Sequence, residues 1–65
     1  MSVGENLRRM RKERNMTLEE LGKKVSVSLS MISQIERGTK ALNIQLAKQI
    51  VDVFGCTTDD FLKDI

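Results

Sequence analysis

Apolar side chains recur along this chain at the spacing of an α-helix. Val3, Leu7 and Met10 lie four and three residues apart, which predicts an amphipathic helix over residues 3–14. Similar patterns predict four further helices, one that begins at Leu18 and stops before Ser26, and three over residues 29–37, 44–54 and 58–63. No segment shows a sustained alternation of apolar and polar residues, so we expect no β-sheet. The pattern therefore predicts an all-α fold, a compact bundle of five short helices.

Residues that favour helix ends stand at the boundaries of these segments. Thr17 followed three residues later by Glu20 is the pattern of a capping box, in which each side chain bonds the other residue's backbone amide. The other expected N-caps are Ser28, Asn43 and Thr57. The residues expected to end helices are Asn15, Gly38 and Gly55. Gly22 differs from these because it lies inside a helix, where glycine is unfavourable by about 0.5–1 kcal/mol relative to alanine. Its position predicts the close approach of another backbone segment.

The helix expected over residues 44–54 carries two apolar stripes. The stripe expected to face the core is formed by Ile44, Ala47, Ile50, Val51 and Phe54. A second set of apolar residues is the candidate dimer interface and consists of Leu42, Leu46, Val53, Phe61 and Ile65. The alternative is that so small a domain needs every apolar side chain for its own core.

The composition indicates one small domain, residues 1–65, without catalytic chemistry. A chain of 65 residues buries only about 60% of its unfolded surface, so its core is small. There is no histidine, and the single cysteine, Cys56, is expected to be a buried apolar residue. We therefore expect neither an enzyme nor a cofactor or metal site. The apolar runs are too short for a membrane span or a signal peptide, which favours the cytoplasm.

The charge is unevenly distributed along the chain. Residues 1–40 carry nine Lys and Arg against five Asp and Glu, a net charge of +4, whereas residues 41–65 carry two against four, a net charge of −2. A basic half suggests a polyanionic partner. A solvated surface with uneven charge explains the same numbers.

Two short helices separated by a tight turn, with Gly22 where they would cross, have the arrangement of a helix-turn-helix over about residues 18–37. The second of these helices would be held by Ile32 and Ile35. Its opposite face, which would then point outward, carries Leu29, Ser30, Ser33, Gln34 and Arg37.

At this point the chain resembles the phage-repressor or Cro-type (XRE-like) helix-turn-helix family. The resemblance rests on residues 17–22, on Val27 and Ser28, and on the run Ile32-Ser33-Gln34-Ile35-Glu36-Arg37-Gly38, and it extends from Gly4 to Leu62. It implies a lambda-repressor-like bundle that binds operator DNA, usually as a symmetric dimer. It also implies a salt bridge between Arg11 and Glu36.

The resemblance assigns DNA contacts that fit the chemistry of the side chains. The helix over residues 29–37 would enter the major groove, and the candidates for base contacts are Leu29, Ser30, Ser33 and Gln34. Gln34 is the strongest of these because its amide can bond adenine N6 and N7, and Leu29 suits a thymine methyl group. The candidates for phosphate contacts are Thr17, Leu18, Ser28, Arg37, Lys40 and Asn43.

Two residues depart from the pattern of the family. Leu18 stands where many relatives have a glutamine, which removes one side-chain contact to phosphate. Ser26 stands where relatives commonly have a glycine with positive φ, at a cost of about 1 kcal/mol.

We therefore expect a sequence-specific DNA-binding transcriptional regulator that binds a palindromic operator as a homodimer. A contact with RNA polymerase is conceivable, and we expect no small-molecule effector because the chain has no room for a separate effector domain. The alternative is a protein-interaction module, such as an antitoxin or a polymerase-binding cofactor. Phosphate binding predicts that Arg8, Arg9, Arg37 and Lys40 contribute and that binding weakens steeply with salt. A protein interface predicts instead that the surface of Leu42, Leu46 and Val53 contributes.

Overall fold

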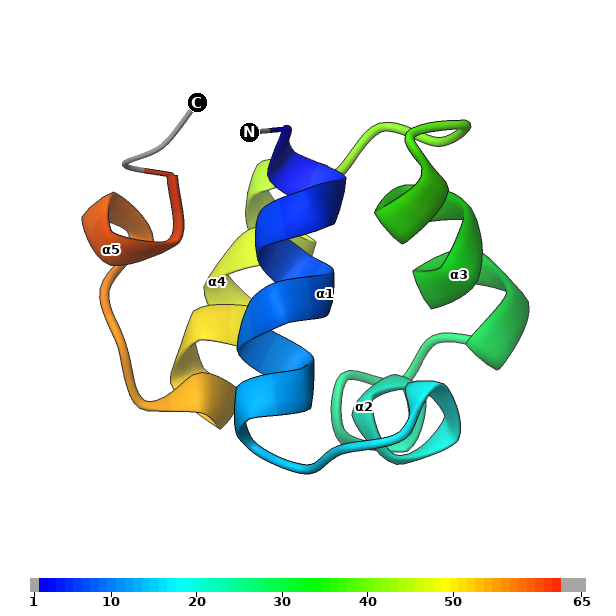
Figure 1. Cartoon of the computed structure of the whole chain (residues 1–65), viewed down its shortest axis with the longest axis horizontal. Coiled ribbons are helices and arrows are strands. Elements are labelled where there is room, and N and C mark those ends of the chain that lie inside the picture. The colour runs from blue at the N-terminus through cyan, green and yellow to red at the C-terminus, as the bar shows by residue number, and fades with distance from the viewer. Residues whose placement is uncertain (1, 63–65) are drawn as a thin grey trace.

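The computed structural model describes residues 2–62, with Asp60 and Leu62 described by their backbone alone. Its helices are α1 (Val3–Glu13), α2 (Leu18–Lys24), α3 (Leu29–Arg37), α4 (Ile44–Phe54) and α5 (Thr58–Leu62). Helix α1 runs through the middle, with α2 and α3 on one side of it and α5 on the other (Figure 1). The molecule is nearly isometric, with dimensions of 25 × 24 × 22 Å. In the described part of the chain, no helix is long and apolar enough to cross a membrane.

The expected all-α fold is confirmed, but the expected bundle of five helices is only partly matched. Helices α1–α4 have seven to eleven residues each, whereas α5 is barely more than one turn, with five residues. The bundle is therefore built by four helices, to which α5 adds a short terminal turn. Lys63, where the last helix was expected to end, lies outside the described residues.

The ends of the helices follow the expected local chemistry. Thr17 and Glu20 form the capping box of α2, and Ser28 and Asn43 accept hydrogen bonds from backbone amides of α3 and α4. Gly38 and Gly55 end these two helices with φ of 81° and 72°. A second capping box, Ser2 with Glu5, begins α1.

Among the described residues, eleven buried apolar side chains form one core. They come from every helix, and Phe61 of α5 is one of those with no exposed surface. The amide of Asn6 is also completely buried, and it donates a hydrogen bond to the backbone oxygen of Phe61 over 3.0 Å. This bond fixes α5 on α1.

The core-facing side of α4 differs from the predicted stripe. Ile44 is 77% exposed, whereas Leu46 is 5% exposed and lies in the core with Ile50, Val51 and Phe54. Leu46 lies on the side of α4 near the turn that connects α2 to α3. Leu46, rather than Ile44, therefore completes the core-facing side of α4.

Candidate nucleic-acid interface

Helix α3 presents its polar face outward, as expected. Ile32 and Ile35 anchor it in the core, with 0% and 2% exposure. On the other side Leu29 is 47% exposed and Ser30 is exposed, while Ser33 and Gln34 are half-buried. The Gln34 side-chain nitrogen donates to the Ser30 hydroxyl over 3.3 Å, so the two side chains lie together on the surface.

An ion pair fixes the end of α3 to α1. The Arg11 guanidinium donates to both carboxylate oxygens of Glu36 over 2.7 and 3.0 Å, and a third bond of 2.7 Å reaches the backbone oxygen of Met16. The side chains of the pair are only 9% and 6% exposed. Two parallel bonds are directional, so this pair sets the orientation of the helix as well as its position.

Two glycines allow the close contacts that position α3. A Cβ atom added to Gly4 would overlap the backbone oxygen of Ile35 and would lie 2.6 Å from that of Glu36. A Cβ atom added to Gly22 would lie 2.7 Å from the backbone oxygen of Val27. The close approach predicted for Gly22 is therefore present, whereas the equivalent role of Gly4 was not predicted.

The turn between α2 and α3 has the positive φ that the family resemblance suggested at Ser26. Ser26 has a φ of 59°, the region that glycine adopts most easily. The Val27 amide donates to the backbone oxygen of Gly22 over 2.9 Å and closes the turn.

Of the three N-cap residues on this part of the molecule, Ser28 and Asn43 keep hydrogen-bond donors for another molecule. The oxygens of Thr17, Ser28 and Asn43 accept bonds from the backbone amides of Glu20, Met31 and Leu46, over 3.0, 3.1 and 2.7 Å. Accepting these bonds leaves the hydroxyl proton of Ser28 and the amide protons of Asn43 available, whereas the Thr17 hydroxyl also bonds the Glu20 carboxylate. Capping and phosphate binding are therefore compatible at Ser28 and Asn43.

The capping box of α2 also makes the carboxyl group of Glu20 more acidic. Its carboxylate accepts a bond from the Thr17 backbone amide over 3.0 Å. Hydrogen bonds from the backbone and the hydroxyl of Thr17 lower the pKa of Glu20 below its ordinary value of 4.5.

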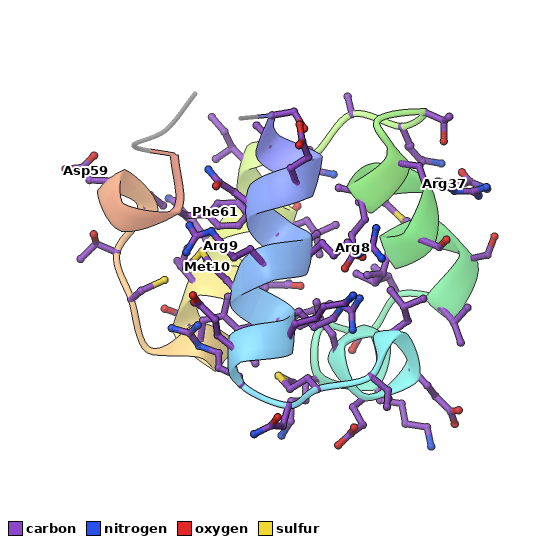
Figure 2. All side chains as sticks on the ribbon, in the orientation of Figure 1. Arg8, Arg9, Met10, Arg37, Asp59 and Phe61 are labelled. Atoms are coloured by element: carbon purple, nitrogen blue, oxygen red, sulfur yellow. The ribbon has the colours of Figure 1, made fainter. Side chains whose placement is uncertain are left out.

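A basic hollow of about 240 Å³ lies between α1, α2 and α3, where α2 begins. It is lined by Arg8, Arg11, Leu18, Ser33, Glu36 and Arg37. Arg11 and Glu36 neutralise each other, whereas Arg8 and Arg37 are exposed and have no acidic partner among the described residues. Figure 2 shows Arg8 between α1 and α3, and Arg37 reaching outward from the end of α3. The hollow thus has a net positive charge.

Arg9 does not belong to this basic surface, although it was expected to contribute to phosphate binding. It bonds the carboxylate of Glu13 and the side-chain oxygen of Asn6, both over 3.3 Å. Figure 2 places it beside Phe61, on the α5 side of α1. One residue along a helix rotates a side chain by about 100°, which separates Arg9 from Arg8.

The predicted dimer interface is wrong for two of its five residues. Leu46 and Phe61 are 5% and 0% exposed in the single chain, so they serve its own core. Leu42 and Val53 are half-buried and pack against that core. Ile65 lies outside the described residues. Cys56 is likewise half-buried rather than fully buried.

The geometry described above recurs in known proteins. The family model HTH_3, described as helix-turn-helix, matches residues 7–61. The HTH-type transcriptional regulator DdrOP3 of Deinococcus deserti is 26% identical over 65 residues, which are all of this chain and 50% of DdrOP3. The chain therefore spans half the length of this curated relative.

Two solved structures are similar over almost the whole chain. The clp gene regulator ClgR of Corynebacterium glutamicum superposes with a TM-score of 0.91 and 31% identity, covering 95% of this chain and 66% of the other. The P22 c2 repressor, solved in complex with a synthetic operator, superposes with a TM-score of 0.88 and 32% identity, covering 100% of this chain and 98% of the other.

Proposed function

The chain belongs to the helix-turn-helix family HTH_3, a family of transcriptional regulators and not of enzymes, and on this premise we propose that it recognises a specific DNA sequence and regulates transcription by occupying that site. The observation that carries the proposal is the outward face of α3, which is rigidly held and carries Leu29, Ser30, Ser33 and Gln34. The likeness to a repressor that was solved with an operator supports it. Such a regulator acts where the DNA is, in the cytoplasm of a prokaryote.

Base contacts are assigned to the first two turns of α3. The Gln34 amide can bond adenine at N6 and N7, and the exposed Leu29 side chain can contact a thymine methyl group. The hydroxyls of Ser30 and Ser33 can bond either a base or a phosphate. Because Gln34 and Ser30 already bond each other, the amide is held in place before DNA binds.

Phosphate contacts surround this face. Ser28 and Asn43 would donate from the side-chain atoms that remain available after capping, and Thr17 would turn its hydroxyl proton from the Glu20 carboxylate to the phosphate. Leu18 would contribute its backbone amide, because the first amides of a helix have no partner within it. Arg37 and Lys40 lie at the end of α3, and Arg8 joins them across the basic hollow. Arg8 and Arg37 would thus replace the side-chain contact that Leu18 cannot make.

A homodimer on a palindromic site completes the proposal. One short α3 helix contacts only a few base pairs, and two copies one helical turn of DNA apart, about 34 Å, double the recognised length. Concentration and dimerisation would then control occupancy.

The test is selection of bound sites from random DNA, followed by binding of the selected site by variants. We expect a palindrome whose half-site matches one α3 helix. Gln34→Ala should weaken binding by about 1–3 kcal/mol and relax one position in each half-site. Gln49→Ala, an exposed glutamine of α4, is the matched control and should leave discrimination unchanged. Enrichment of no sequence at all would contradict the proposal.

Variants of the basic hollow test the phosphate contacts separately from the base contacts. Replacing Arg8 or Arg37 by methionine should weaken binding to all sequences alike and reduce the dependence of log K on log salt by about 1 for each phosphate contact in the bound complex. Arg9→Met should change neither quantity, because Arg9 lies on the α5 side of α1. Equal effects of all three variants would place the DNA on a different surface.

A further inference from the structure

Ser30 and Gln34 of α3 form a side-chain pair that limits the hydrogen bonds each of them can offer to DNA. The Gln34 side-chain nitrogen donates to the Ser30 hydroxyl oxygen over 3.3 Å. A carboxamide group carries two N–H protons and one acceptor oxygen. Gln34 therefore keeps one N–H and its oxygen for another molecule, and these are the two groups that a bidentate contact with adenine requires.

The same bond also sets the role of the Ser30 hydroxyl. Its oxygen accepts the proton from Gln34, and no atom of the described residues accepts the proton of the hydroxyl itself. The Ser30 side chain is exposed, so this proton is available to a molecule that binds α3. Ser30 is thus arranged to donate a hydrogen bond to DNA.

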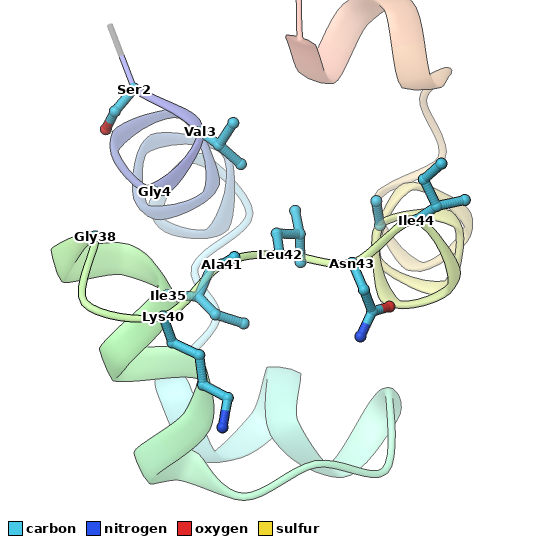
Figure 3. Close-up of a pocket in the computed structure, with 11 residues that line it drawn as sticks. Ser2, Val3, Gly4, Ile35, Gly38, Lys40, Ala41, Leu42, Asn43 and Ile44 are labelled. Atoms are coloured by element: carbon cyan, nitrogen blue, oxygen red, sulfur yellow. The ribbon is translucent and has the colours of Figure 1, made fainter.

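The backbone of Gln34 is held independently of this pair. Its carbonyl oxygen accepts bonds from the backbone amides of Thr39 and Lys40 over 3.0 and 3.3 Å, and from the Thr39 hydroxyl over 3.1 Å. Figure 3 shows the Lys40 side chain leaving this loop and extending along α3. The main chain at Gln34 is therefore fixed by the loop, and the bond to Ser30 decides the direction of the side-chain amide.

We propose that Ser30 and Gln34 recognise two adjacent base pairs as one unit, in which the amide binds adenine and the hydroxyl donates to the neighbouring base. Ser30 would then determine specificity at its own position and, by orienting Gln34, at the adenine. This inference rests on the proposed function, because it requires α3 to enter the major groove. The bonded atoms of the pair are 3.3 Å apart, and successive bases of a strand are about 3.4 Å apart. The pair can thus reach two neighbouring bases without rearrangement.

The base edges in the major groove define which neighbour the pair prefers. Guanine presents the acceptors N7 and O6, adenine presents N7 and thymine presents O4, whereas cytosine presents only the N4 donor. A donating Ser30 hydroxyl therefore favours guanine and disfavours cytosine next to the adenine. Ser33 is the natural comparison, because it carries the same hydroxyl on α3 but has no hydrogen bond to the Gln34 side chain.

Selection of bound sites from random DNA with the full 65-residue chain and its variants tests the proposal. The wild-type protein should select an adenine whose neighbour is rarely cytosine. Ser30→Ala should relax both positions, and it should lower the preference for adenine by about three- to tenfold, which corresponds to one hydrogen bond. Ser33→Ala is the matched control and should leave the preference for adenine unchanged. Ser30→Thr retains a hydroxyl and should retain that preference too.

Nuclear magnetic resonance relaxation of the side-chain amides tests the pair in the absence of DNA. The Gln34 amide should be more ordered on the picosecond to nanosecond timescale than that of Gln49, which is exposed and has no hydrogen-bond partner among the described residues. Ser30→Ala should remove the difference, whereas Ser33→Ala should preserve it. A Gln34 amide as mobile as that of Gln49 in the wild-type protein would overturn the proposal.

The two experiments distinguish this inference from the proposal of DNA recognition. If the wild type selects a defined site but Ser30→Ala relaxes only its own position, the two residues do not act as a unit, and the proposed function stands. Cytosine selected beside the adenine has the same meaning. If the wild type enriches no sequence, the proposed function is wrong, and the role of the pair in recognition is wrong with it even where the Gln34 amide is ordered.

Discussion

The Arg11–Glu36 pair offers the sharpest test of how this small fold holds helix α3. We consider Arg11→Met, which keeps an unbranched apolar stem but removes the guanidinium. The variant loses the bonds of 2.7 and 3.0 Å to Glu36 and the bond of 2.7 Å to the Met16 oxygen. It also leaves a carboxylate that is 6% exposed without its partner.

The expected loss follows from that unpaired charge. Breaking a buried pair by removing one partner destabilises a protein by about 3–5 kcal/mol, most of which reflects the charge left behind. A domain of 65 residues has a total stability of roughly 3–10 kcal/mol. Arg11→Met should therefore unfold much of the population or lower the urea midpoint severely.

A double-mutant cycle separates the pair from its surroundings. Arg11→Met combined with Glu36→Met should be less destabilised than the sum of the two single variants, by more than about 1 kcal/mol, because no charge remains buried. Urea unfolding followed by circular dichroism at equal protein concentrations measures all four proteins. Additive losses, or a loss below 1 kcal/mol for Arg11→Met, would refute the view that this pair anchors α3.

Three further predictions concern the turn and the cap of α2. Gly22→Ala should destabilise the fold by about 1–3 kcal/mol in urea unfolding, although alanine has the better helix propensity, because the new Cβ atom would lie 2.7 Å from the backbone oxygen of Val27. The control is Lys23→Ala on the exposed side of the helix, which should change the stability by less than about 0.5 kcal/mol. Ser26→Gly should raise the thermal midpoint and increase the free energy of unfolding by up to about 1 kcal/mol, because glycine adopts the φ of 59° without strain. A lower thermal midpoint would show that the serine backbone is not strained. The pKa of Glu20 in the folded state is lowered from 4.5, so the stability that its carboxylate contributes is present above pH 4.5 and is lost as the pH falls through the lower folded-state pKa. Glu20→Gln removes this contribution and should therefore flatten the fall of the urea midpoint in acid. An acid profile that matches the wild type would contradict the assignment.

The features that were predictable from the sequence are those that local chemistry decides. Thr17, Ser28 and Asn43 cap helices because of their own side chains and the backbone next to them. Gly22 was informative because glycine inside a helix has a cost that only a close contact explains. The Arg11–Glu36 pair, in contrast, came from resemblance to a family, because residues 25 positions apart carry no local signal of contact.

The features that were not predictable depend on how one helix is rotated against its neighbours. The apolar arc of α4 includes Ile44 at one edge and Leu46 at the other, and the fold buries Leu46 while it leaves Ile44 exposed. Arg8 and Arg9 are adjacent in the sequence and chemically alike, yet one lines the basic hollow and the other packs beside α5. Periodicity in the sequence gives the angles between the side chains of one helix, but it does not give the rotation of that helix relative to its neighbours.

Helix α3 holds the proposed base-reading residues in one rigid unit. Its first turns carry Leu29 and Ser30, and its last turn is held by the Glu36 carboxylate and the close approach of Gly4. If pairing of the proposed homodimer is weak in solution, it would become effective when two copies lie on adjacent half-sites, because the shared DNA raises their effective concentration. Occupancy of the proposed operator would then rise with about the square of the monomer concentration. Such a response would make occupancy depend steeply on the abundance of the regulator.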